Sequence, residues 1–128
     1  MTLLKKYADY AYALLRIMTG VMFSFHGAQK ILGILSGVQP PVGSQLWFGG
    51  IIELVGGLAV MLGLQTRLAA FLCSGMMAEA YFQFHWKFQI GPGFFPIINK
   101  GELAVLYCFV FFLIACRGGV KWSIDKLS

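Results

Sequence analysis

Long apolar segments alternate with short polar ones along almost the whole chain. Four stand out, at residues 10–33, 46–64, 68–86 and 99–117, the last being an apolar stretch at 102–116 extended upstream by one turn. Each approaches the roughly 20 residues that a helix needs to cross the hydrocarbon core of a bilayer. Backbone groups in lipid must be satisfied within their own segment, which favours helices. The pattern predicts an all-α, integral membrane, antiparallel four-helix bundle that forms a single domain over residues 1–128.

Two longer connections, 34–45 and 87–101, separate the predicted helices on one side of the membrane. Both contain Pro and Gly, which disfavour regular helix. The second is too apolar for a free loop, so we expect it to dip into the membrane interface or to fold over the bundle through Phe88, Phe94, Phe95, Ile97 and Ile98.

Basic residues outside the apolar segments predict the orientation. Four spans place both termini on the same side as the tight turn at 65–67, and cytoplasmic loops carry an excess of Lys and Arg. Both termini are therefore expected in the cytoplasm, because six basic residues lie on their side and three on the other: Lys5, Lys6, Arg67, Arg117, Lys121 and Lys126 against Lys30, Lys87 and Lys100. Lys5 and Lys6 also precede an apolar run as in a signal peptide, but Arg16 interrupts that run and it is too long, so we expect it to remain as a span.

Composition supports a chain in contact with the lipid bilayer. Hydrophobic residues make up 59% of the sequence and charged residues 12%, where about a quarter is usual. The net charge of +5 comes from scattered residues without a basic stripe, which excludes nucleic acid as an expected partner. The three cysteines, Cys73, Cys108 and Cys116, all lie in apolar segments and are interpreted as small packing residues rather than as a disulfide scaffold.

Ionisable residues gather at one predicted depth. His26, Glu53 and Glu79 each lie seven residues from the outer end of their segment, about 10 Å below the outer surface at about 1.5 Å per residue. Charges at that depth are costly and should face inward and pair. We therefore expect the two carboxylates to meet the bases of the first helix in one desolvated layer, and the candidate ligand-binding residues are His26, Lys30, Glu53, Glu79, Gln83 and His85.

Four glycines surround Glu53 at helical spacing: Gly49, Gly50, Gly56 and Gly57. A helix face without side chains allows the close approach of a neighbouring backbone or of a flat ligand. The glycine pattern is compatible with a close-packed neighbouring helix and with a bound flat ligand.

Further polar residues are expected to have structural roles. Arg16 lies in the inner half of the first segment, with Asp9 or Asp125 as its expected partner. The tail sequence "WSID" is predicted to clamp the base of the bundle. The remaining structural polar candidates lie at the outer rim of the fourth segment: Asn99, Lys100 and Glu102.

Five stretches together carry a resemblance to a known family. They are "LLRIMTGVMFSFHGAQKILG", "GGIIELVGGLAVMLGL", "AEAYFQFH", "PIINKGELAVLYCF" and "GGVKWSIDKLS", and they span almost the whole chain. In this order they resemble the DoxX family of small four-helix membrane proteins. The resemblance implies a protein of the prokaryotic cytoplasmic (inner) membrane. It also implies a link to membrane oxidoreductase complexes, because some relatives serve in them, including a thiosulfate:quinone oxidoreductase. It carries no catalytic assignment, and whether the chain is an enzyme stays open.

Several chemistries compete for the charged layer. A quinone needs an apolar slot with donors and acceptors for its oxygens, whereas a satisfied ion-pair layer would only set helix register. A Glu-x-x-His pair and an HExxH motif are both absent, so no metal is expected. The cysteines lie away from the histidines, which disfavours a cysteine nucleophile. Transport would require a homo-oligomer, because four short helices rarely suffice.

The function favoured by these features is an integral membrane component of an oxidoreductase complex, with redox partner subunits. It would bind a quinone or another apolar small molecule in a charged layer near the outer leaflet. The alternative is a non-catalytic membrane scaffold or assembly factor that binds partner helices through the glycine face.

Overall fold

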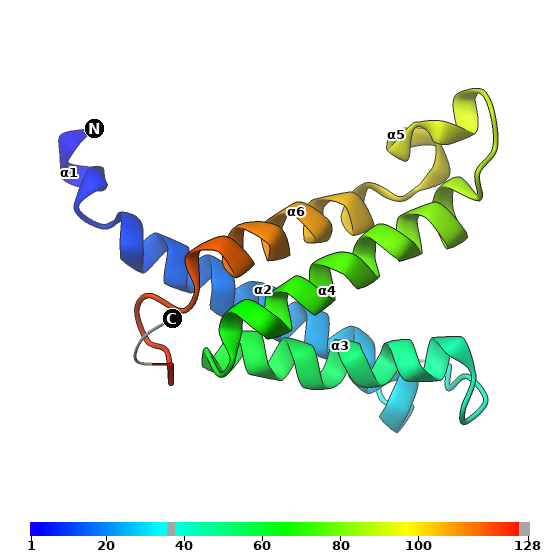
Figure 1. Ribbon diagram of the computed structural model, residues 1–128, viewed down its shortest axis with the longest axis horizontal. Helices are drawn as coiled ribbons and strands as arrows, with labels where there is room; N and C mark the ends of the chain where they lie inside the picture. The colour runs from blue at the N-terminus through cyan, green and yellow to red at the C-terminus, as the bar shows by residue number, and fades with distance from the viewer. Residues whose placement is uncertain (36–37, 126–128) are drawn as a thin grey trace.

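The computed structural model describes residues 1–35 and 38–125. Every regular element in this part of the chain is helical, which confirms the all-α class (Figure 1). The elements are α1 (Thr2–Lys5), α2 (Ala8–Leu32), α3 (Gln45–Leu62), α4 (Thr66–Ala80), a π-helix η1 (Tyr81–Trp86), a short 3₁₀-helix η2 (Pro92–Phe94), α5 (Pro96–Asn99) and α6 (Glu102–Arg117).

The first two long helices match their predicted segments to within two residues at each end. α2 ends where Gly33 adopts a left-handed conformation with φ of 66°, which glycine enters without steric cost. α3 begins after Ser44, whose side chain accepts a hydrogen bond from the Trp47 amide at 3.3 Å. Gly63, with φ of 70°, ends α3 and opens the tight turn into α4.

The third and fourth segments depart from the predicted regular helices. α4 continues without interruption into η1, where the Lys87 amide donates to the Phe82 carbonyl five residues earlier, at 2.9 Å. The prediction that the fourth helix starts at Asn99 is wrong. Lys100 adopts a left-handed conformation with φ of 65°, and the Asn99 side chain accepts from the Gly101 amide at 2.8 Å, so α5 ends there and α6 begins at Glu102.

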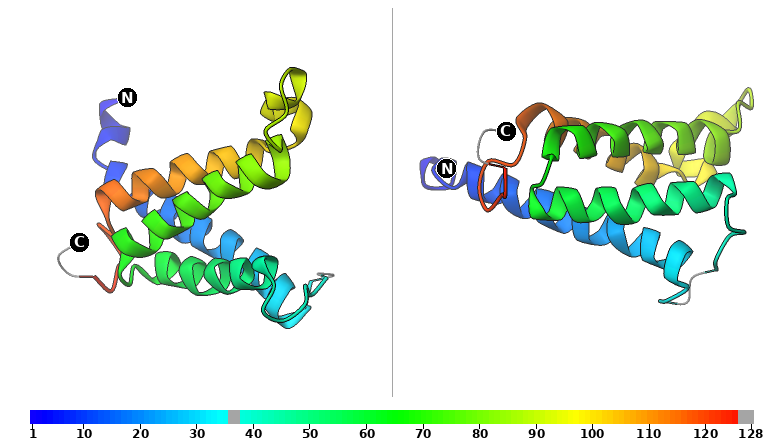
Figure 2. Two further views of the ribbon diagram at one scale, coloured as in Figure 1. Left: turned by 45° about the vertical axis from the view of Figure 1, so that its right-hand side comes forward. Right: turned by 60° about the horizontal axis from the view of Figure 1, so that its bottom comes forward.

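The long helices form two pairs, α2 with α3 and α4 with α6. The pairs meet near the termini and the α3–α4 turn and diverge toward the other end, where η1 and α5 lie (Figure 2). The end at which they meet is called the closed end below, and the other the open end. A core of buried apolar side chains joins the pairs: Tyr12, Phe23, Val60, Ala70, Cys73, Tyr107, Phe111 and Ile114.

Glycines allow α2 and α3 to pack at backbone distance. A methyl group at Gly57 would lie 2.6 Å from the Ser24 amide nitrogen and 2.8 Å from the Gly20 carbonyl oxygen, and one at Gly50 would lie 2.8 Å from Lys30 Cβ. Gly56 faces α4, where a methyl would lie 2.6 Å from Cys73 Sγ. The glycine face predicted for partner helices is therefore mostly occupied by the chain's own helices.

Arg16 holds the closed end together. Its side chain is fully buried and donates to the carbonyls of Val60 and Met61 at the end of α3, at 2.7 and 2.9 Å. It also reaches three tail carbonyls, those of Gly119, Lys121 and Trp122, at 2.8 to 3.2 Å. Arg16 therefore donates to backbone carbonyls rather than to a carboxylate. The expected direct ion pair with Asp9 or Asp125 is absent from the described residues, although Asp125 lies near enough to interact with Arg16 electrostatically.

The two carboxylates have other partners. Asp9 pairs with Arg117 at 2.9 Å. Asp125 accepts from the Thr66 hydroxyl and amide at 2.6 and 2.8 Å and from the Gln65 amide at 2.9 Å, which caps the start of α4. Ser123 donates to the Gly63 carbonyl at 2.9 Å. These contacts agree with the predicted clamp by the tail.

The segment between η1 and α6 is tied to the helices by polar contacts while its apolar side chains face outward. Asn99 donates to the Tyr81 hydroxyl at 3.0 Å and to the Gly93 carbonyl at 2.9 Å, and the Tyr81 hydroxyl donates to the Phe94 carbonyl. The apolar side chains predicted to contact the membrane or the bundle are all exposed: Phe88, Phe94, Phe95, Ile97 and Ile98.

Large apolar side chains cover the outer faces of all four long helices. Representative residues are Leu14, Met18 and Phe25 on α2, Phe48 and Val55 on α3, Leu68 and Phe71 on α4, and Leu106 and Phe109 on α6, each more than half exposed. Contiguous apolar surface of this kind marks contact with a membrane or with other proteins. Within the described residues α3 is the one helix that has both the length and the hydropathy to cross a membrane.

Candidate functional site

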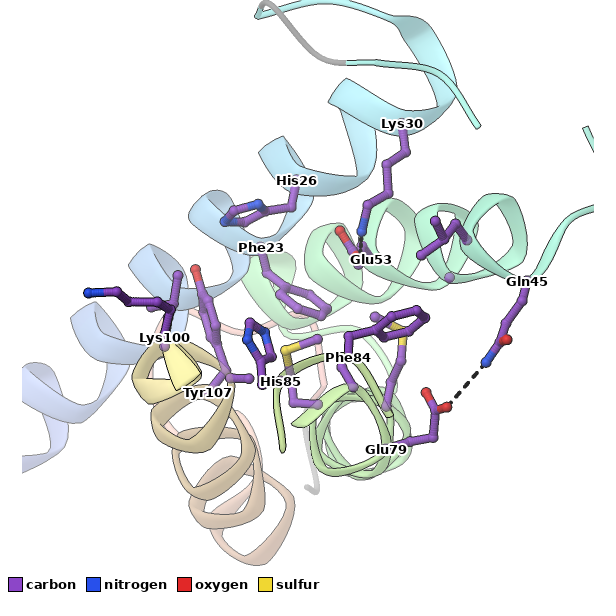
Figure 3. A pocket seen from close by; sticks show the side chains of 17 residues that line it. Phe23, His26, Lys30, Gln45, Glu53, Glu79, Phe84, His85, Lys100 and Tyr107 are labelled. Atoms are coloured by element: carbon purple, nitrogen blue, oxygen red, sulfur yellow. Dashed lines mark hydrogen bonds and ion pairs between the residues drawn. The ribbon is translucent and has the colours of Figure 1, made fainter. Parts of the chain in front are cut away.

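A pocket of about 400 Å³ lies between the two helix pairs at the open end (Figure 3). α2, α3, α4, η1 and α6 all contribute to its walls. The apolar part of the lining includes Phe23, Met76, Met77, Phe84, Leu103 and Tyr107. Most ligand sites have this form, a largely apolar concavity with a few placed polar groups.

Lys30 and Glu53 form an ion pair across the α2–α3 contact, as the sequence predicts. Glu53 is 3% exposed, and Lys30 reaches its Oε1 atom from above (Figure 3). The second carboxylate oxygen, Oε2, is buried and has no hydrogen-bond partner among the described residues. An ionised carboxylate only accepts hydrogen bonds, and a buried acceptor without a donor is costly. The wall of the pocket therefore contains a buried acceptor without a donor.

Tyr107 contributes a second unpaired polar atom to the same pocket. Its ring packs against Phe23 and Phe111 at centroid distances of 5.2 and 5.7 Å, which holds the side chain in place. The residue is 6% exposed, and its hydroxyl also lacks a hydrogen-bond partner in the described part of the chain. Buried polar groups are nearly always hydrogen-bonded in native proteins. Two residues that line one pocket thus each carry a buried polar atom without a hydrogen-bond partner among the described residues.

Glu79 does not join the pair formed by Lys30 and Glu53, so the predicted layer with two buried carboxylates is wrong. Glu79 is exposed and accepts from Gln45 Nε2 at 3.1 Å at the edge of the pocket (Figure 3). Gln45 and Gln83 also exchange hydrogen bonds, at 2.8 and 3.0 Å. These three side chains instead link the start of α3 to the end of α4 and to η1.

The two histidines reach the pocket by different routes. His26 is exposed on α2, and its ring stands at 89° to that of Tyr107 with 6.3 Å between centroids. His85 comes from η1, and its Nδ1 lies 3.4 Å from the Asn99 carbonyl oxygen. Lys100 lines the pocket from the turn before α6, whereas Glu102 is exposed and does not line it. The structure thus places five of the six candidate ligand-binding residues on one pocket, with Gln83 beside it. The described residues hold no group of three or more His, Cys, Asp or Glu that is arranged for a metal ion.

Sequence reasoning missed Gln45 and Tyr107. Gln45 lies in the first turn of α3, where a polar side chain is common because it can pair with the free backbone groups of the helix end. Tyr107 lies in the middle of an apolar run, seven residues after Lys100, and a tyrosine hydroxyl within such a run is the signal that could have marked it. The sequence alone does not show that these two side chains face the same pocket, because that depends on how the neighbouring helices pack.

The fold and the pocket define a small helical protein with an apolar exterior and a polar, ligand-sized cavity between two helix pairs. Residues 11–86 match the DoxX family model, and the chain belongs to the DoxX family. A protein of Haemophilus influenzae described as uncharacterized is 42% identical over 96% of this chain and 94% of its own length. The inner membrane protein YqjF of Escherichia coli is 28% identical over 97% of this chain and 96% of its own length. No solved structure matches the chain. Family and relatives support a membrane protein.

Proposed function

We propose that this chain is the integral membrane component of an oxidoreductase complex and binds a quinone or a similar apolar small molecule between its two helix pairs. The observation that carries the proposal is that two residues lining the pocket each hold a buried polar atom without a partner, Glu53 Oε2 and the Tyr107 hydroxyl. Helix packing alone gives no reason to bury them unpaired. A ligand with polar oxygens on an apolar body would satisfy both.

The other groups of the pocket fit the same chemistry. Lys30, Lys100 and the two histidines supply N–H donors at several positions of the rim, while Phe23, Phe84 and Met77 supply flat and adaptable apolar contacts. The chain's own contribution is to bind and orient the molecule and to exclude water from it. Electrons would pass to or from a redox partner subunit, which is what the family resemblance suggests.

We further propose that the four long helices cross the inner membrane with the closed end in the cytoplasm. The two termini and the α3–α4 turn lie at that end (Figure 1), together with the basic residues Lys5, Lys6, Arg67, Arg117 and Lys121. Lys126, counted in the same prediction, lies outside the described residues. The exposed apolar faces of the helices would then contact lipid, and the pocket would open in the outer half of the bilayer.

The scaffold alternative has lost its main support. Gly50 and Gly57 are in backbone contact with α2, and Gly56 is covered by Cys73, so a partner helix cannot use the same positions. Gly49 remains open, and it lines the pocket.

Mass spectrometry of organic extracts from the protein purified in mild detergent tests the proposal. The wild-type chain should carry an extractable quinone, in its oxidised or reduced form, or another apolar molecule. Glu53→Gln should reduce the retention of a ligand that donates a hydroxyl to Glu53 about five- to hundred-fold, as expected for the loss of a buried hydrogen bond worth about 1–3 kcal/mol. Glu102→Gln makes the same chemical change at an exposed position outside the pocket and should retain the wild-type amount. A wild-type protein with an empty pocket that also binds no added quinone would contradict the proposal.

A further inference from the structure

We infer that the pocket selects an aromatic ligand that donates a hydrogen bond from a ring hydroxyl, and discriminates against the same ring when it carries only acceptors. In quinone chemistry this is the reduced, hydroquinone form. The inference rests on the proposed function and specifies which form of the ligand the site binds.

The first step concerns Glu53. Lys30 satisfies one of its carboxylate oxygens, and the other is buried without a donor. A carboxylate has no hydrogen to offer, so it repels a quinone carbonyl oxygen and attracts a hydroxyl. Hydrogen bonds to ionised acceptors are also stronger than those between neutral groups. The deepest acid of the pocket therefore favours a donor.

The second step concerns the positions of the donors. Lys30 places one of its three N–H donors on Glu53, and its side chain is about a third exposed. His26, His85 and Lys100 also approach from partly or fully exposed positions, so water can satisfy a ligand carbonyl beside any of these donors. Among the buried groups, the Tyr107 hydroxyl is the one that can donate or accept. A ligand hydroxyl can pair with either group, as a donor to Glu53 Oε2 and as a donor or acceptor with Tyr107. An acceptor-only ligand can satisfy Tyr107 alone and leaves the carboxylate oxygen unpaired.

The third step concerns the body of the ligand. The rings of Phe23, Tyr107, His26, His85 and Phe84 and the thioethers of Met76 and Met77 surround the space. Aromatic faces and edges and methionine sulfur favour a flat aromatic ring over a branched aliphatic one. Protein sites built to pair a ligand hydroxyl reject analogues that lack it strongly, because the site's own buried groups are then left unpaired.

Binding of three probes that share one ring and one decyl chain tests the inference: a benzoquinone, its hydroquinone and the dimethyl ether of that hydroquinone. Affinities are measured by equilibrium dialysis against the purified full chain in detergent, without oxygen so that the hydroquinone stays reduced. The hydroquinone should bind at least tenfold more tightly than the quinone and the ether. In Glu53→Gln the amide can donate to a carbonyl, so the preference should vanish or reverse. Glu102→Gln should keep the wild-type preference.

The double variant Lys30→Gln/Glu53→Gln removes the lysine charge that Glu53→Gln leaves unpaired, and it should also lack the preference. If either Glu53 variant fails to fold, the comparison of the three probes on the wild-type protein still tests whether the pocket prefers the hydroquinone. Equal binding of all three, or tighter binding of the quinone, overturns the inference and leaves the proposed function standing. Binding of none of the probes overturns both.

Discussion

Replacing Gly57 by alanine tests how closely α2 and α3 depend on each other. The added methyl would lie 2.6 Å from the Ser24 amide nitrogen, 2.8 Å from the Gly20 carbonyl oxygen and 2.9 Å from Ser24 Cα. All three atoms belong to the backbone of α2, so no side-chain rotation relieves the clash and the two helices must separate.

Gly75→Ala is the matched control, because a methyl at this exposed position of α4 meets no atom within 4 Å. Both substitutions gain about 0.5–1 kcal/mol from the replacement of a helical glycine. Overpacking costs typically about 1–3 kcal/mol, and that cost applies to Gly57 alone. The helix-propensity gain cancels between the two variants, so Gly57→Ala should be about 1–3 kcal/mol less stable than Gly75→Ala.

The assay is equilibrium unfolding in mixed micelles with an increasing mole fraction of sodium dodecyl sulfate, followed by far-UV circular dichroism. Equal free energies of unfolding for the two variants would refute the close packing of α2 on α3. Equal values would also support the scaffold alternative, in which the glycine face binds a partner helix. That alternative predicts a Gly57 variant that folds normally and loses only the binding of the partner helix.

Three other predictions concern the closed end. Arg16→Met should lower the free energy of unfolding by about 3–5 kcal/mol, because five backbone carbonyls lose a buried charged donor, whereas the exposed Arg67→Met should cost about 1 kcal/mol in the same unfolding assay. The Thr66 hydroxyl, and then the Thr66 and Gln65 amides, hold the pKa of Asp125 below its usual value of about 3.9. The contribution of Asp125 to the stability of the folded state is thus present above about pH 4 and is lost as the pH falls through the lowered pKa. The melting temperature should therefore fall less between about pH 6 and about pH 3 for Asp125→Asn than for the wild type. Cys116 is exposed one residue before the end of α6, so a membrane-impermeant maleimide should label it in inside-out but not in right-side-out vesicles. Labelling of right-side-out vesicles that disappears in Cys116→Ala would reverse the proposed orientation.

The apolar pattern predicted the long helices because helix formation in an apolar environment is decided by neighbours along the chain. Gly33 and Gly63 end their helices. A rise of about 1.5 Å per residue placed Glu53 level with His26, one helical turn from Lys30, and the structure pairs Glu53 with the long side chain of Lys30. The tail clamp was also predicted in outline.

What the sequence could not supply was the rotation of each helix about its axis and the angle between the helix pairs. Glu79 lies on the predicted helix but turns toward Gln45, and Tyr107 turns inward to the pocket. η1 is a separate departure, because its wider turn changes the direction of the side chains after Ala80, His85 among them. These orientations depend on contacts between residues far apart in sequence, such as Gly57 against Gly20 and Arg16 against the tail. Helicity and position along each helix are therefore properties of the sequence, whereas the pocket and its unpaired acceptor exist only once the two helix pairs have packed at one end and diverged at the other.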